Sequence, residues 1–282
     1  MITKPNVKIN LGLHVLSRRS DGFHEIETLF VPYFGIHDRL EIIPAGSGSE
    51  TAGHIEEIYA GTATRAVTPD GKVTITIARR QGVDWDPLKD LSARAYALLD
   101  EEFHLPPVEI FLEKTSPVGA GLGGGSADAA FALRMLSEMF SLGLSDDDLA
   151  LKASRLGSDC AFFVFNRPMT GRGRGEILNI FDTGSLFEDY EIRVVVPEGI
   201  YVSTADAYRG ITPRERGPQE GLEEVLRHPV AEWKDLLVND FEATVFSKYP
   251  ALAAAKQDIY DSGAVYAAMS GSGSALFGLF KK

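Results

Sequence analysis

The sequence predicts a protein of the α+β class with two domains. Its 282 residues are about twice the length of a domain of roughly 150 residues. Segments in which apolar and polar residues alternate are concentrated before residue 115, and long amphipathic segments follow them. Because strands and helices do not alternate regularly, we expect α+β architecture rather than a doubly wound sheet. A shift to glycine and arginine at Gly171–Gly175 lies near the boundary, which gives domains of residues 1–168 and 169–282.

The first half begins with strands. In Lys8–Val15 every second residue is apolar, which predicts a half-buried strand whose other face carries Lys8, Asn10 and His14. The same alternation occurs in three further segments, Arg39–Ile43, Lys72–Ile77 and Val108–Leu112.

Apolar residues at helical spacing predict three helices in this half, at Leu88–Phe103, Ser126–Phe140 and Ser145–Leu156. Ser145 and Asp148 form a helix start signal, and Gly157 is the expected stop. In the second half we expect a strand at Ile192–Val196, a helix at Ala251–Tyr260, and a closing hairpin. The hairpin pairs Ala264–Met269 with Ser274–Phe280 across the turn Ser270–Gly273.

Composition narrows the function. The chain has 28 Lys and Arg against 40 Asp and Glu, a net charge of −12, which argues against nucleic acid and anionic membranes as partners. The single cysteine, Cys160, excludes an intrachain disulfide and a cysteine-based zinc cluster. No apolar run is long enough to span a bilayer, and the N-terminus lacks a signal peptide, so we expect a cytoplasmic protein.

The most informative segment is the glycine loop, Pro117–Ser126, which leads into an amphipathic helix. Five of the seven residues from Gly119 to Gly125 are glycine. Such a loop can take positive φ angles and direct its N–H groups at an anion, next to the positive end of a helix dipole. We interpret it as a phosphate cradle; the plain alternative is a flexible surface loop. It is not a Walker A loop, because no Gly-Lys-Ser/Thr follows.

The glycine loop resembles the Pro-x-x-x-Gly-Leu-Gly-Ser/Gly-Ser-Ala-Ala motif of the GHMP small-molecule kinases. Three other segments, in the same order along the chain, are similar to motifs of one branch of that superfamily: Pro5–Leu11, Arg18–Glu25 and Met269–Gly273. The resemblance spans most of the sequence. It implies an N-terminal domain like domain 2 of ribosomal protein S5, a C-terminal ferredoxin-like α/β sandwich, and an active cleft between them.

The resemblance also implies an activity. Members of this branch use ATP, with Mg²⁺, to phosphorylate the 2-hydroxyl of a cytidine-diphosphate-linked methylerythritol in the non-mevalonate route to isoprenoids. We therefore expect a small-molecule substrate and a monomer or weak dimer. Two alternatives stay open: another kinase of the superfamily, for mevalonate-type, homoserine or sugar acceptors, and a non-catalytic nucleotide-binding protein of the same fold.

For catalysis, the resemblance assigns Lys8 and the aspartate of the Leu-Gly-x-Asp motif, here Asp159. Asp159 is expected just beyond a helix C-terminus, where the helix dipole disfavours a negative charge, so a nearby cation such as Lys8 would help to keep it ionised. The plain alternatives are a solvated lysine on an edge strand and an aspartate in a turn. Two departures from the family pattern are Cys160-Ala161 in place of Val-Pro, and Asp90 in place of an asparagine.

For binding, the resemblance implies two groups of residues. The ATP phosphates would contact Pro117, Gly119, Ala120, Gly121, Leu122, Gly123, Gly124, Gly125 and Ser126, with Ser126 also a candidate Mg²⁺ ligand. The acceptor would contact Asn10, Phe23, His24 and Tyr208, with the cytosine between the rings of Phe23 and Tyr208 and its edge read by His24. Without the motifs these aromatic residues would be read as ordinary core or surface residues, and Ser270–Gly273 as a plain hairpin turn.

Overall fold

The computed structural model describes residues 1–282, apart from the side chain of Pro218, and divides into two compact units. Unit 1 consists of Met1–Val7, Phe34–Val118 and Gly123–Asn166; unit 2 consists of Lys8–Tyr33, Gly119–Leu122 and Arg167–Lys282. Each unit is thus assembled from discontinuous segments, and the glycine loop contributes to both. The continuous domains 1–168 and 169–282 remain a prediction from the sequence.

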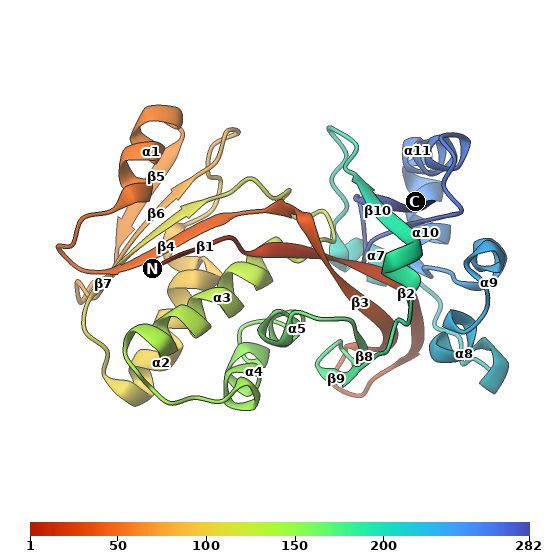
Figure 1. Ribbon diagram of the computed structural model, residues 1–282, viewed down its shortest axis with the longest axis horizontal. Coiled ribbons are helices and arrows are strands. Elements are labelled where there is room, and N and C mark those ends of the chain that lie inside the picture. Colours follow the sequence, from red (N-terminus) through yellow and green to blue (C-terminus); the bar gives the residue numbers. More distant parts are fainter. The chain divides into compact units, whose positions relative to one another are not determined.

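Unit 1 contains a five-stranded sheet (Figure 1). In spatial order its strands are β1 (Ile2–Thr3), β4 (Arg39–Pro44), β7 (Val108–Glu113), β6 (Val73–Ala78) and β5 (Ala63–Val67). Neighbouring strands are antiparallel except for β6 and β7, which are parallel. The predicted strands at Arg39, Lys72 and Val108 are confirmed, whereas β5 was not predicted.

Helices cover both faces of this sheet (Figure 1). The helices of unit 1 are α1 (Glu50–Ile58), the short 3₁₀ helix η1 (Pro87–Lys89), α2 (Leu91–Phe103), α3 (Gly124–Met139), α4 (Asp146–Ser154) and α5 (Cys160–Phe165), of which α4 and α5 pack against α3. Ile55 and Tyr59 pack with Ile43 and Phe111 on the face covered by α1, and α2 and α3 lie against the other face. The capping box predicted at Ser145 is present, but α4 ends at Ser154 rather than Leu156. Asp90, the departure from the family pattern, caps α2 by accepting from the Ser92 amide.

A buried ion cluster fixes the chain just before the glycine loop. The Lys114 ammonium donates to Asp38 and Asp128, and all three side chains are almost fully buried. Burial raises the pKa of Asp128 well above its usual range, whereas Asp38 accepts further bonds from the backbone and side chain of Ser116. The Ser116 hydroxyl lies 2.3 Å from where a Cβ of Gly124 would be, so helix α3 can start here only with a glycine.

Unit 2 contains two further sheets. The four-stranded sheet has the order β2 (Asn6–Arg18), β3 (His24–His37), β8 (Met169–Gly173) and β9 (Ile177–Ile180); the first two residues of β2 and the last four of β3 belong to unit 1. The three-stranded sheet has the order β10 (Tyr190–Val195), β12 (Leu276–Lys281) and β11 (Tyr266–Met269). The predicted strand at Lys8 is present as part of β2, but it is not half-buried: both of its faces are covered, and Lys8, Asn10 and His14 are at most 3% exposed. The closing hairpin is confirmed, with Met269 opposite Leu276.

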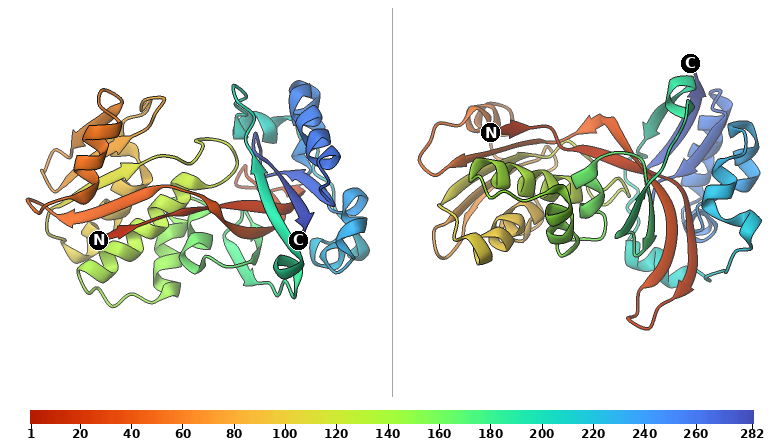
Figure 2. Two further views of the ribbon diagram at one scale, coloured as in Figure 1. Left: turned by 45° about the horizontal axis from the view of Figure 1, so that its top comes forward. Right: turned by 60° about the horizontal axis from the view of Figure 1, so that its bottom comes forward.

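Short helices complete unit 2, and Figure 2 shows the last ones against the three-stranded sheet. They are α6 (Leu186–Asp189), α7 (Thr204–Gly210), η2 (Pro218–Glu220), α8 (Leu222–Leu226), η3 (Val230–Glu232), α9 (Trp233–Leu236), α10 (Phe241–Lys248) and α11 (Pro250–Asp261). Leu13, Phe241, Leu252 and Leu276 are central to the core that these elements share. The helix predicted at Ala251–Tyr260 is confirmed as α11.

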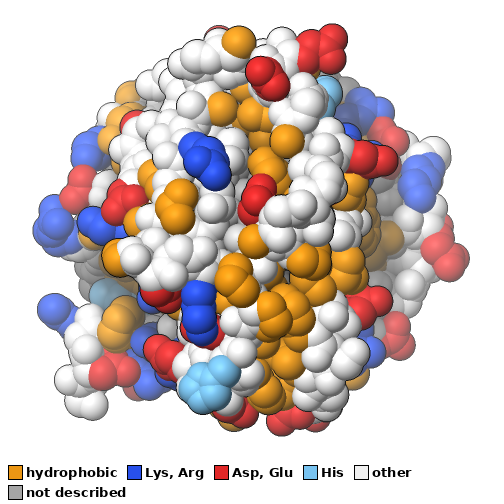
Figure 3. All heavy atoms as spheres, turned by 90° about the vertical axis from the view of Figure 1, so that its left-hand side faces the viewer, with side chains coloured by type: hydrophobic (Ala, Val, Ile, Leu, Met, Phe, Trp, Pro, Cys, Tyr) orange, Lys and Arg blue, Asp and Glu red, His pale blue; other side chains and the backbone are white. Residues whose placement is uncertain are grey.

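On the face drawn in Figure 3, acidic and basic side chains are interspersed around a band of apolar ones. The net charge of −12 is thus not collected into one acidic field on this face. None of the described helices is both long and apolar enough to cross a membrane.

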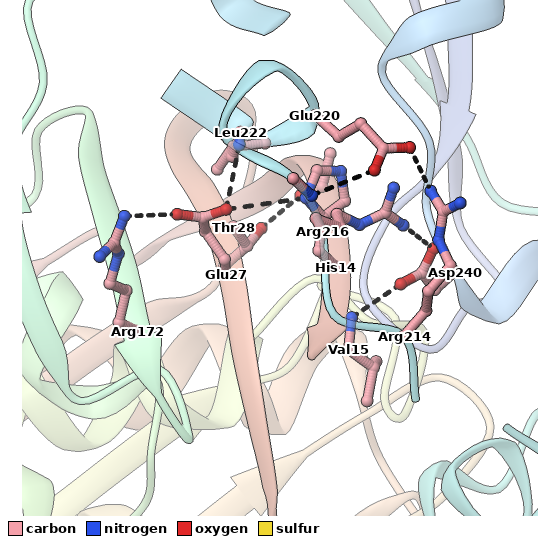
Figure 4. Close-up of polar contacts among 12 residues, drawn as sticks. His14, Val15, Glu27, Thr28, Arg172, Arg214, Arg216, Glu220, Leu222 and Asp240 are labelled. Carbon is pink, nitrogen blue, oxygen red and sulfur yellow. Dashed lines mark hydrogen bonds and ion pairs between the residues drawn. The ribbon is translucent and has the colours of Figure 1, made fainter. Parts of the chain in front are cut away.

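A buried polar network in unit 2 surrounds Glu27 (Figure 4). Its carboxylate accepts from the Leu222 amide at 3.0 Å and from the Arg172 guanidinium at 2.6 Å. Nδ1 of the fully buried His14 lies 3.7 Å from the same carboxylate. His14 has the largest effect, and together with Leu222 and Arg172 it outweighs burial and holds the pKa of Glu27 at about 2.

This network predicts a loss of stability in acid. The pKa of Glu27 is below its usual 4.5, so its stabilising effect is complete above about pH 4.5 and disappears as the pH falls toward about 2. We expect Glu27→Gln to lower the free energy of unfolding at pH 7 by roughly 1–3 kcal/mol and to reduce its pH dependence between these values. Urea unfolding from pH 2 to 7 measures both; parallel curves for the two proteins would contradict the assignment.

Candidate active site

The glycine loop forms a sharply folded turn that enters helix α3. Gly119, Gly121 and Gly123 all have positive φ angles, between 70° and 77°. Gly123 is the N-cap of α3. The prediction that the glycines permit a left-handed backbone at the start of a helix is therefore confirmed.

The loop is held through its carbonyl oxygens. The Ala120 carbonyl accepts from the Ala275 amide at 3.0 Å, and the Leu122 carbonyl accepts from the Lys8 amide at 2.9 Å. In a trans peptide the C=O and the following N–H point in opposite directions. The next N–H groups along the loop therefore point away from the groups that hold these carbonyls.

Lys8 is attached to the middle of the loop. Its ammonium donates to the Gly121 carbonyl at 2.9 Å and to Oδ1 of Asn10 at 2.6 Å, and it lies 5.5 Å from the centre of the Phe30 ring. Lys8 is 3% exposed and Asn10 is 2% exposed. The strand alternation that predicted Lys8 and Asn10 on one face is thus reproduced as a direct contact between their side chains.

The C-terminal turn Ser270–Gly273 completes this part of the site. The Ser270 hydroxyl donates to the Gly121 carbonyl at 3.0 Å and accepts from the backbone N–H of Asn10. The Ser270 carbonyl lies only 2.2 Å from where a Cβ of Gly121 would be, so the two backbones can approach only because residue 121 is glycine. The turn is more than a simple link between β11 and β12.

Asn239 anchors the same turn, and the sequence alone did not reveal this role. Its side-chain amide donates to the carbonyls of Met269 and Gly271 at 2.7 and 2.8 Å. Its Oδ1 accepts from the Phe241 amide at the start of α10. Only the position of Asn239 against the Ser270 turn connects it with the site.

In unit 1, the segment that carries Asp159 lies against the start of α3. A Cβ on Gly157 would lie 3.2 Å from the Cys160 sulfur and 3.9 Å from the Ser126 hydroxyl, so the small glycine allows this close packing. Cys160 is fully buried, and this burial raises the pKa of its thiol to about 12, so it is a packed, unreactive side chain. Half-buried Asp159 therefore lies in the chain segment next to Ser126.

The expected position of Asp159 relative to the helix dipole is wrong. Asp159 does not follow a helix C-terminus directly; α4 ends at Ser154, and Asp159 is the N-cap of the short helix α5. A helix N-terminus favours a carboxylate, so the dipole acts in the opposite sense to the one inferred from the sequence.

The predicted base-binding residues are distributed as follows. The His24 and Tyr208 rings stack with centroids 4.8 Å apart, and Tyr208 packs edge-on against Phe241. Phe23 is 53% exposed and lies under the Arg174 guanidinium, 4.8 Å away. Burial, with a smaller effect from Arg18, lowers the pKa of His24 from 6.5, which favours a neutral ring with one donor and one acceptor nitrogen.

The described residues contain no group of three or more His, Cys, Asp or Glu side chains arranged to hold a metal ion. Ser126, the predicted metal ligand, lies in the first turn of α3.

Two glycine substitutions should separate the structural role of the loop, its packing against Ser270, from its expected role in nucleotide binding. Gly121→Ala places a methyl group against Ser270 at a positive φ angle, and we expect a clear fall in Tm together with loss of activity. Gly125 faces open space, so Gly125→Ala should keep the wild-type Tm; if the loop binds phosphate as the sequence predicts, the added methyl group should raise the KM for the nucleotide. Thermal unfolding and kinetics measure both; an unchanged KM in Gly125→Ala would contradict this role.

Comparison with known proteins places this geometry in a family. Residues 90–167 match "GHMP kinases N terminal domain" and residues 222–282 match "GHMP kinases C terminal". A 4-diphosphocytidyl-2-C-methyl-D-erythritol kinase of Bacteroides fragilis is 43% identical, with 99% of this chain and 92% of the relative covered. The enzyme of the same name from Chlorobium limicola is 36% identical, with 99% and 88% covered.

Solved structures agree. A crystal structure of 4-(cytidine 5'-diphospho)-2C-methyl-D-erythritol kinase has a TM-score of 0.74 at 32% identity, with 99% of this chain and 90% of that chain covered. Mevalonate kinase of Methanococcus jannaschii has a TM-score of 0.65 over 100% and 90% of the two chains, but at 11% identity it shows the fold alone. With full-length relatives at this identity, the chain belongs to the GHMP kinase family.

Proposed function

We propose that this kinase transfers the γ-phosphoryl group of ATP to the 2-hydroxyl of 4-diphosphocytidyl-2-C-methyl-D-erythritol. The observation that carries the proposal is the attachment of the Lys8 ammonium to the Gly121 carbonyl of the glycine loop, beside Asn10. Full-length relatives that bear the name of this activity support the choice of acceptor. The reaction would belong to the non-mevalonate route to isoprenoid precursors.

The ATP phosphates would lie on the glycine loop. The loop carbonyls are bound by Ala275, Lys8 and Ser270. Their trans peptides direct the following N–H groups the other way, and the N-terminus of α3 adds the positive end of its dipole. The residues proposed to contact the phosphates are Pro117, Gly119, Ala120, Gly121, Leu122, Gly123, Gly124, Gly125 and Ser126.

A magnesium ion would be bound together with the phosphates, with the Ser126 hydroxyl as its protein ligand. Mg²⁺ commonly keeps several waters and uses few protein oxygens when phosphates are present, so one hydroxyl at a helix start suits it. When bound, the ion would offset phosphate charge.

Asp159 and Lys8 would act on the acceptor. The Asp159 carboxylate would accept the proton of the 2-hydroxyl as its oxygen forms the new bond to phosphorus and the bond to ADP breaks. The Lys8 ammonium would offset the negative charge that develops between these groups.

His24, Phe23 and Tyr208 would recognise the cytosine. A neutral His24 can donate to one edge atom of the base and accept from another. Tyr208 already stacks on His24, and the exposed ring of Phe23 offers a second aromatic face. Asn10, the other residue assigned to the acceptor, would act beside Lys8.

We further propose a cytoplasmic enzyme that works as a monomer or weak dimer.

Replacing Asp159 tests the carboxylate. We expect Asp159→Asn to reduce kcat by at least 100-fold while ATP affinity changes less than threefold, because the shape is kept and the proton acceptor is lost. Steady-state kinetics and calorimetric ATP titration measure the two effects. The matched control is Asp147→Asn, an exposed aspartate in the first turn of α4, which should keep full activity. Wild-type turnover in Asp159→Asn would remove the carboxylate from the mechanism.

An ADP-release assay across a panel of alcohols tests the acceptor. We expect turnover with 4-diphosphocytidyl-2-C-methyl-D-erythritol and at least 100-fold lower kcat/KM with mevalonate, homoserine and galactose. His24→Ala should raise the KM for the cytidine acceptor about tenfold or more, as the loss of a hydrogen bond to a buried base edge would. Preference for another alcohol would favour a different kinase, and no turnover with any acceptor would favour a non-catalytic protein.

A further inference from the structure

We propose that Thr28 is a positioning residue that fixes the orientation of the Asn10 amide and, through it, the Lys8 ammonium. Thr28 lies on β3, is fully buried, and belongs to none of the motifs that indicated the site. The inference rests on the proposed function only in placing Lys8 at the reacting centre. Its structural basis is a chain of hydrogen bonds within unit 2.

The chain has three links between side chains and backbone. The Thr28 hydroxyl donates to the Gly12 carbonyl at 2.5 Å. Nδ2 of Asn10 donates to the Thr28 oxygen at 3.1 Å. The Lys8 ammonium donates to Oδ1 of Asn10 at 2.6 Å.

The number of hydrogens on each group allows only one arrangement of donors and acceptors in these three hydrogen bonds. A threonine hydroxyl has a single hydrogen, and a backbone carbonyl can only accept. Once the hydrogen of Thr28 is directed at the Gly12 carbonyl, its oxygen can only accept from Asn10. The NH₂ group of Asn10 must therefore face Thr28, and its carbonyl oxygen must face Lys8, which can only donate.

The carbonyl that starts the chain is itself held in place. Gly12 has a φ of +70°, and a Cβ there would lie 2.6 Å from Leu237 and 2.7 Å from Leu222. The next residue, Leu13, exchanges backbone hydrogen bonds with Val238 and Asp240. This packing fixes the Gly12 backbone. The direction of the hydrogen bonds from Thr28 to Asn10 and Lys8 is therefore determined at Gly12.

Loss of the Thr28 hydroxyl would remove this control. The buried NH₂ group of Asn10 would lose its acceptor, and the amide could rotate to present NH₂ to the ammonium. A reversed amide withdraws one acceptor from Lys8 and turns a donor toward it. The ammonium would then no longer be aimed by Asn10, although ATP could still bind the glycine loop.

The test compares Thr28→Val with Thr28→Ser. Valine keeps the shape and loses the hydroxyl; serine keeps the hydroxyl and loses a methyl group. We expect Thr28→Val to lower kcat about tenfold with the KM for ATP within twofold, and Thr28→Ser to keep kcat within twofold of wild type. Thr170→Val, the same change at a buried position on β8, should leave kcat unchanged. Equal losses in the valine and serine variants, or no loss in valine, would overturn the proposal.

A double-mutant cycle shows whether Thr28 acts through Asn10. In an Asn10→Ala background, Thr28→Val should change kcat by less than twofold, because the amide that it orients is absent. A further tenfold loss in that background would show an independent, structural effect. Thermal unfolding of each variant identifies losses of kcat that come from unfolding.

A readout without turnover separates this proposal from the proposed function. In ¹⁵N-labelled protein, the Asn10 side-chain NH₂ protons should exchange slowly with solvent in wild type and Thr28→Ser, and at least tenfold faster in Thr28→Val. Wild type that is inactive with every acceptor but shows this pattern would refute the proposed function and support the orienting role. Equal exchange rates in all three proteins would overturn the orienting role, whatever the activity.

Discussion

The carbonyl oxygen of Gly121 is the acceptor on which the arrangement of the site depends. It receives hydrogen bonds from the Lys8 ammonium and the Ser270 hydroxyl, which come from opposite ends of the chain. Two such bonds are possible only because the loop backbone approaches the Ser270 turn without an intervening side chain. The shape of the loop, the direction of the Lys8 side chain and the position of the C-terminal turn therefore depend on one another.

The parts of the fold that sequence analysis predicted are those with strong local patterns. The alternation from Lys8 to Val15 and the capping box at Ser145 depend on neighbouring residues, and both are present. Strand β3 was missed because apolar and polar residues do not alternate in it: Glu27 and Thr28 are adjacent polar residues, and Leu29–Val31 are all apolar. Helix α1 was missed as well, because it buries only Thr51 and Ile55, which are too few residues to form an apolar stripe in the sequence.

Strand β8 shows what a composition signal does not contain. The segment lies just after the change of unit between Asn166 and Arg167, and it pairs with β3 in register from Ile26–Gly173 to Phe30–Met169, a partner that its glycines and arginines did not reveal. Gly171 is required there because a Cβ would lie 2.4 Å from the Phe30 ring. A glycine that makes room for a distant aromatic residue looks, in the sequence, like one that supplies flexibility.

The residues of the candidate site also fall into two groups: those that local sequence motifs identified and those that only long-range contacts reveal. Lys8 was identified through its resemblance to a family motif, and the glycine loop through its composition directly before a helix. The contributions of Thr28 and Asn239 come from long-range hydrogen bonds, which no local pattern encodes. The polarity of the helix beside Asp159 was misjudged because α5 has only six residues, too few for a periodic signal.

The solitary sulfhydryl of the chain has a practical consequence. Cys160 is enclosed in the protein and holds its proton strongly, so it is a poor nucleophile toward maleimides and similar reagents under mild conditions. A cysteine introduced at any exposed position would be the one fast-reacting thiol. Fluorescent or spin labels can therefore be attached at chosen places without first removing the native residue, and paired labels can report how the molecule moves during its reaction cycle.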